Sequence, residues 1–238
     1  MTPMPRTDNE IRHAAAVREM FAGIAGRYDL LNHLLSANID RSWRRKVRKK
    51  LEPVLQNEKA LVLDVACGTG DLSIELERDA QAQVLGTDFC RPMLTVAREK
   101  SLSIPFVEAD AMNLAFGDNT FDAVTIAFGL RNLSNLADGL RELHRVLKTG
   151  GTLIVLEFSS PVVPGFRGAF NFYFSKILPR IGGIVSGSRG AYEYLPDSVS
   201  KFPDQKQLAA MMQETGFDIV EYTNLTGGIA AMHAGEKI

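Results

Sequence analysis

Between residues 60 and 159 the sequence alternates between short apolar runs and amphipathic segments. Continuous apolar runs of this length are typical of strands that are buried on both faces of a sheet. Strands are predicted at 60–65, 83–89, 104–110, 121–128 and 151–159, and helices at 71–78, 91–100 and 136–147. This alternation predicts βαβ units, and therefore an α/β fold with a doubly wound, Rossmann-like parallel sheet.

Two more strand patterns, at 217–225 and 228–237, follow later in the chain, and the glycine pair between them predicts an antiparallel hairpin. The sheet is therefore expected to have seven strands. Residues 160–200 interrupt the alternation and are rich in Phe, Tyr, Gly and Pro, so we expect an insertion there.

Ahead of the sheet, residues 10–52 carry apolar side chains at helical spacing, with a break near Gly26. Residues 1–9 are polar and are expected to be frayed. We therefore expect an N-terminal helical cap at residues 1–52 and one α/β domain at residues 53–238, which contains the insertion.

The composition excludes several classes of protein. A net charge of −1 over 238 residues gives no general attraction to nucleic acid. The sequence shows no secretory signal and no apolar stretch long enough to span a membrane, so we expect a cytoplasmic protein. The four His and two Cys are scattered, which predicts no metal site.

The turn after the first strand is DVACGTG, from Asp64 through Gly68 and Thr69 to Gly70. Glycines at this point let a ligand approach the backbone closely. The dinucleotide fingerprint requires a third glycine where this chain has Ser73, so an NAD site is incomplete. An acid at Asp64 would repel a pyrophosphate but would attract an ammonium group.

Acids also follow the next two strands. Asp88 is placed to accept hydrogen bonds from the hydroxyls of a ribose. Asp110, with Ala111 beside it, is placed to accept from an adenine amino group. The pattern therefore favours a nucleoside with a cationic amino-acid part, and S-adenosylmethionine fits. Single glycine motifs often only close turns, and Asp88 alone is also consistent with a helix N-cap.

Several longer stretches carry a resemblance to a known family. The central region resembles the class I S-adenosylmethionine-dependent methyltransferases with a seven-stranded sheet. The stretches YDLLNHLLSANIDRSW, FGLRN, RVLKTGGTLIVLEFS, AYEYLPDSVSKFPD and LTGGIAAMHAGEK resemble the ubiquinone/menaquinone biosynthesis C-methyltransferases. The similarity covers nearly the whole chain after residue 15.

The resemblance implies methyl transfer from S-adenosylmethionine to a ring carbon of a prenylated quinol, with S-adenosylhomocysteine as product and no metal. Demethylmenaquinol is the expected acceptor, and a ubiquinol precursor remains open. Arg131 would stabilise a developing phenolate, and Asn132 would hydrogen-bond a ring oxygen. Tyr28 and Asn32 would close over the ring, and Asp40 would accept a proton or hold its acceptor.

Other interpretations remain open. Arg131 is also consistent with a structural ion pair, and Tyr28 with core packing. Phe166, Phe170, Phe172, Tyr173 and Phe174 would line a site for the prenyl tail or would be core or dimer contacts. The basic run at 41–50 favours peripheral membrane contact or a solvated helix face. The alternative functions are an NAD(P)-dependent oxidoreductase, a methyltransferase for another apolar molecule, and a non-catalytic lipid-binding protein.

Overall fold

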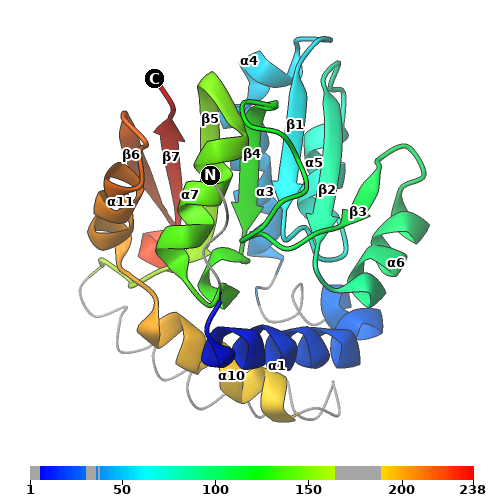
Figure 1. Ribbon diagram of the computed structural model, residues 1–238, viewed down its shortest axis with the longest axis vertical. Helices are drawn as coiled ribbons and strands as arrows, with labels where there is room; N and C mark the ends of the chain where they lie inside the picture. The colour runs from blue at the N-terminus through cyan, green and yellow to red at the C-terminus, as the bar shows by residue number, and fades with distance from the viewer. Residues whose placement is uncertain (1–5, 31–35, 37, 164–188) are drawn as a thin grey trace.

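The computed structural model describes residues 6–30, 36, 38–163 and 189–238. Within these residues, seven strands form one sheet in the order β3-β2-β1-β4-β5-β7-β6 (Figure 1). The strands are β1 Leu61–Val65, β2 Gln83–Asp88, β3 Phe106–Glu108, β4 Phe121–Ala127, β5 Leu147–Phe158, β6 Val220–Leu225 and β7 Ala230–Glu236. Strands β1 to β5 pair with one another in parallel, and β7 lies between β5 and β6 and is antiparallel to both. The predicted sheet and its terminal hairpin are confirmed.

Alternating side chains of the central strands are buried on opposite faces of the sheet, as the pleat requires. Leu63 and Val65 pack in a cluster with α7 (Leu136–Val146) and α11 (Gln205–Glu214). Val62 packs on the other face in a cluster with α3 (Ile39–Lys50), α4 (Glu52–Leu55) and α5 (Asp71–Glu77). Burial on both faces explains why these strands have almost continuous apolar sequences.

The segment between β3 and β4 differs from a regular βαβ unit. After α6 (Arg91–Lys100), strand β3 ends at Glu108, earlier than the predicted residue 110. The described chain from 109 to 120 then runs as turns and bends without a helix. Asp110 pairs with Asn113 in an isolated bridge. An irregular segment therefore follows β3 at the carboxyl edge of the sheet.

Helix α1 (Asp8–Ile24) lies across the carboxyl ends of the strands, with α10 (Arg189–Lys201) beside it (Figure 1). A capping box between Thr7 and Glu10 begins α1. The expectation that residues 1–9 fray is therefore wrong for residues 6–9, while residues 1–5 lie outside the described part. The predicted break near Gly26 is a short 3₁₀ turn, η1, at Ala25–Arg27.

Helix α3 belongs to the layer that covers the sheet, because Trp43 and Val47 are buried in the same cluster as β1 and β2. The domain boundary at 52/53 stays a prediction. Arg41, Arg45, Lys46 and Lys49 are exposed on α3, and membrane contact through them also stays a prediction. In the described part of the chain, no helix combines the length and apolarity needed to cross a membrane.

Candidate active site

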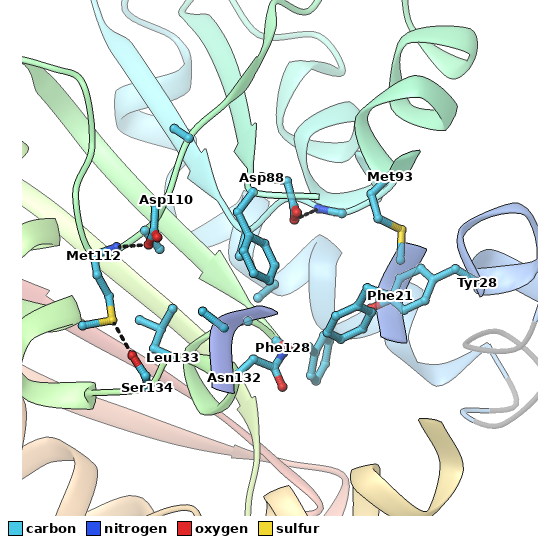
Figure 2. Close-up of a pocket in the computed structure, with 18 of the residues that line it drawn as sticks. Phe21, Tyr28, Asp88, Met93, Asp110, Met112, Phe128, Asn132, Leu133 and Ser134 are labelled. Carbon is cyan, nitrogen blue, oxygen red and sulfur yellow. Dashed lines mark hydrogen bonds between the residues drawn. The ribbon is translucent and has the colours of Figure 1, made fainter. Parts of the chain in front are cut away.

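A pocket lies at the carboxyl ends of β1, β2 and β4, where α1 passes over the sheet (Figure 2). The pocket and the solvent at its mouth together enclose about 740 Å³. Side chains from five separate segments meet here. The lining includes Arg6, Phe21, Tyr28, Gly68, Asp88, Met93, Asp110, Met112, Phe128, Asn132 and Ser134.

The turn after β1 and the end of β2 form one side of the pocket. Gly68 has a φ of 56°, and its N–H donates to Asp88 Oδ2 at 2.9 Å. Asp88 Oδ1 accepts from Cys90 N–H at 2.8 Å, so this carboxylate also supports the start of α6. Burial raises the pKa of Asp88 to about 6 despite these bonds. Gly68 and Asp88 both line the pocket, which is where residues that bind a cofactor are expected.

Asp64 lies behind this turn rather than in the lining. Its carboxylate is fully buried and accepts from the hydroxyls of Ser73 at 2.6 Å and Thr125 at 2.8 Å. Burial raises the pKa of Asp64 to about 6, against these two hydrogen bonds. Ser73, where the dinucleotide fingerprint has glycine, therefore satisfies a buried acid. Contact between Asp64 and a ligand ammonium group stays a prediction.

Thr69 and Gly70 also shape the turn from outside the lining. The buried Thr69 hydroxyl donates to the carboxylate of Asp29, which lies between η1 and α3 in the chain. Gly70 has a φ of 82° and precedes α5, and a Cβ there would lie 3.0 Å from the ring of Phe106. The turn therefore requires glycine at this position for both conformation and space.

Asp110 faces the pocket and forms an ion pair with Arg6, with 2.7 Å between Nη1 and Oδ2. Its Oδ1 accepts from Met112 N–H at 2.9 Å. Burial alone would raise the pKa of Asp110, but the bonds from Arg6 and Met112 outweigh it and lower the pKa below its usual value. Ala111 is buried beside Asp110 in the same wall. No local pattern singles out Arg6, which lies ahead of the first helical pattern.

Strained backbone marks the ends of β1 and β4. Ala66 and Phe128, which both line the pocket, have φ values of 52° and 56°. A bulky residue with positive φ is costly and persists where its surroundings fix it. Phe128 N–H donates to Leu156 O at 2.7 Å, and a Cβ on Gly129 would lie only 2.6 Å from Ala66 Cβ. The two strand ends are thus in close contact at the floor of the pocket.

Arg131, expected beside the ring, lies outside the pocket lining in a buried ion pair. Its Nη1 donates to Glu157 Oε1 at 3.0 Å, to Oε2 at 2.9 Å and to Phe128 O at 2.6 Å. Its guanidinium also lies 5.4 Å from the ring centre of Phe158. Only 6% of the Arg131 side chain and 1% of Glu157 are exposed. The geometry supports the ion-pair interpretation, and contact with substrate stays a prediction.

Asn132 does line the pocket, together with Tyr28. Tyr28 packs edge-on against Phe21 at 5.9 Å between ring centres, and it lies next to Gly68. Asp40 is elsewhere: it is buried and accepts from Arg44 Nη1 at 2.7 Å and from Ser36 at 2.6 Å. A proton-accepting role for Asp40 stays a prediction. Asn32 and the five aromatics at 166–174 lie outside the described residues.

Four of the predicted cofactor residues meet in the pocket: Gly68, Asp88, Asp110 and Ala111. The lining contains acceptors for hydroxyl and amino groups next to apolar side chains. The Nη2 atom of Arg6 is buried there and has no hydrogen-bond partner among the described residues. Among the described residues, no group of His, Cys, Asp and Glu is arranged to hold a metal ion.

Comparisons with known proteins identify the family of the chain. Residues 8–237 match the model of the ubiE/COQ5 methyltransferase family. A demethylmenaquinone methyltransferase from Deinococcus radiodurans is 51% identical, over 93% of this chain and 92% of that protein. A relative from Geotalea uraniireducens, named ubiquinone/menaquinone biosynthesis C-methyltransferase UbiE, is 44% identical, over 93% of this chain and 96% of that protein.

Among solved structures, an S-adenosylmethionine-dependent methyltransferase from Thermotoga maritima superposes with a TM-score of 0.67. The match covers 92% of this chain and 99% of that chain at 17% sequence identity, so it shows the fold alone. The fold is that of the class I methyltransferases, as expected from the order and direction of the strands.

Proposed function

Because the chain belongs to the ubiE/COQ5 methyltransferase family, we propose that it methylates a ring carbon of demethylmenaquinol with S-adenosylmethionine as donor. The observation that carries this proposal is the match of nearly the whole chain to relatives named for this reaction. A nicotinamide-dependent oxidoreductase has no support from the family or from the glycine turn.

The pocket residues fit S-adenosylmethionine. Asp88 would accept from the ribose hydroxyls, and Asp110 would accept from the adenine amino group. Gly68 has no Cβ, so its backbone is open to the approach of a ligand. Among the described residues beyond its chain neighbours, a Cβ added there would meet only the ring of Tyr28, at 3.8 Å. The buried Nη2 of Arg6, which has no partner in the described part of the chain, offers one further donor. When bound, the cofactor supplies an electrophilic methyl group on a sulfonium.

The chain must then hold the quinol ring and exclude water. Phe21, Tyr28, Phe128 and Leu133 give the pocket an apolar side that suits an aromatic ring. Asn132 provides a polar group on this side for a ring oxygen. A rigid pocket of this kind accelerates the reaction mainly by positioning the ring carbon in line with the methyl group.

The choice of quinol is the finer part of the proposal. The relatives from Deinococcus radiodurans and Thermus thermophilus are named for demethylmenaquinone, and the Geotalea relative is named for both ubiquinone and menaquinone. We place demethylmenaquinol first because the relatives with 51% and 48% identity carry that name alone. A demethylated ubiquinol precursor is the second candidate.

Transfer of labelled methyl groups to the two reduced quinols, each assayed separately, tests the proposal. We expect transfer to demethylmenaquinol that is lost in Asp88→Asn and retained in Asp79→Asn, since Asp79 is an exposed acid that does not line the pocket. Binding of S-adenosylhomocysteine should stabilise the parent protein against heat, and NADH should not. Binding without transfer to either quinol would indicate another apolar acceptor.

A further inference from the structure

Asn132 is held by three separate elements. Its side-chain Oδ1 accepts from the hydroxyl of Tyr194, on α10, at 3.1 Å. Its Nδ2 donates to Phe128 O at 3.3 Å, within the turn after β4. His13 Nε2, on α1, lies 3.3 Å from its backbone oxygen. Asn132 lies on the pocket wall (Figure 2). Contacts from three elements leave it little freedom to reorient.

These contacts fix which way the amide of Asn132 faces. The Phe128 carbonyl can only accept, so the amide nitrogen must face it and the amide oxygen must face Tyr194. Tyr194 must therefore donate. Burial raises the pKa of Tyr194, against the effect of Arg131, so its phenol keeps the proton that this bond needs.

One donor of the amide then remains for a ligand. An asparagine amide has two N–H groups, and Phe128 takes one of them. Within the described part of the chain, the other N–H has no protein acceptor, and Asn132 lines the pocket. Tyr194 itself is absent from the lining, so among the described residues its hydrogen bond to Asn132 is its link to a bound molecule.

We propose that Tyr194 is a positioning residue, which holds the Asn132 amide so that its remaining N–H donates to a ring oxygen of the quinol. The proposal rests on the proposed function. It gives α10, in the AYEYLPDSV stretch, a role in the reaction. Removing the Tyr194 hydroxyl would let the amide rotate and present its oxygen, which repels a phenolate.

The test is a double-mutant cycle with Tyr194→Phe and Asn132→Ala in labelled methyl transfer to demethylmenaquinol. We expect Tyr194→Phe to lower kcat about tenfold, in line with the loss of one positioned hydrogen bond, with little change in KM for the quinol. In the Asn132→Ala protein, the same change should have less than about a twofold effect. Tyr222→Phe is the matched control, because Tyr222 lies on β6 at the edge of the sheet.

The affinity for S-adenosylhomocysteine and the melting temperature separate positioning from general damage. Both should stay close to the parent values in Tyr194→Phe, because the ring and its packing are kept. Multiplicative effects of the two substitutions on kcat, or an equal loss of product binding, would overturn the role of Tyr194 while leaving the proposed function intact. No transfer to the quinol by the parent protein would overturn both.

Discussion

Replacing Arg131 with Met is expected to destabilise the fold, because it breaks the buried ion pair with Glu157. Glu157 is 1% exposed. After the change, the donors left to its carboxylate among the described residues are the backbone N–H groups of residue 131 at 3.3 Å and of Phe158 at 2.9 Å. Removing one partner of a buried pair typically costs about 3–5 kcal/mol. Against a usual total stability of about 5–15 kcal/mol, this loss is large.

This loss of stability should appear as a lower melting temperature. For a domain of this length, each kcal/mol changes the melting temperature by about 2–4 °C, so Arg131→Met should melt about 6–20 °C below the parent. Arg131→Met combined with Glu157→Gln should recover part of the loss, because no uncompensated charge remains. Urea unfolding followed by circular dichroism measures all three free energies of unfolding.

The pH dependence gives an independent check. Burial already raises the pKa of Glu157, against Arg131, and the loss of Arg131 must raise it further. A carboxyl with a raised folded-state pKa favours the folded state below its unfolded pKa, and this advantage is lost as pH rises through the folded pKa. The deficit of Arg131→Met should therefore be smaller at about pH 6 than at about pH 8.

These measurements decide what Arg131 does. A melting temperature of Arg131→Met that matches the parent, combined with loss of methyl transfer and normal S-adenosylhomocysteine binding, would refute the ion-pair reasoning and point to direct contact with the ring. A large loss of stability with activity recovered in the double variant would support a purely structural pair.

Gly129→Ala should lower the affinity for S-adenosylhomocysteine more than tenfold and cost about 1–3 kcal/mol of stability, because the new Cβ would overlap the floor of the pocket. Isothermal titration measures the affinity. The control is Gly23→Ala, which should bind normally because no described atom lies within 4 Å of the added Cβ. As pH falls below about 6, Asp88 takes up a proton and loses acceptor capacity. The affinity of the parent protein for S-adenosylhomocysteine should therefore drop about tenfold near pH 5. Asp88→Asn should show a weaker but flat pH profile, and a steep profile in that variant would assign the titration to another group.

The sheet could be predicted because its cause is visible in local sequence. A strand that is buried on both faces must be apolar along its length, and glycine pairs mark the turns. Helix α11 follows the same rules, since Asp204 and Gln207 form a capping box at its start. The break at Gly26 was predicted from the same kind of local evidence.

The candidate site was only partly predictable, because partners far apart in sequence decide which way a polar side chain faces. Glu157 ends an apolar run and Arg131 lies 26 positions before it, and no local pattern pairs them. Asp64 follows the rule for an acid after a strand, yet the hydroxyls of Ser73 and Thr125 hold it in the interior. Arg6 reaches Asp110 across 104 positions, a contact set by the docking of α1.

The position of Arg6 also matters for how the protein is handled. Arg6 contacts Asp110 inside the pocket, and five extended residues span at most about 18 Å. Any affinity tag fused ahead of residue 1 is therefore joined to the pocket by no more than about 18 Å of chain. Strand β7 runs antiparallel to β5 and carries Ile238 to the opposite edge of the sheet (Figure 1). An affinity tag placed after Ile238 therefore lies away from the pocket.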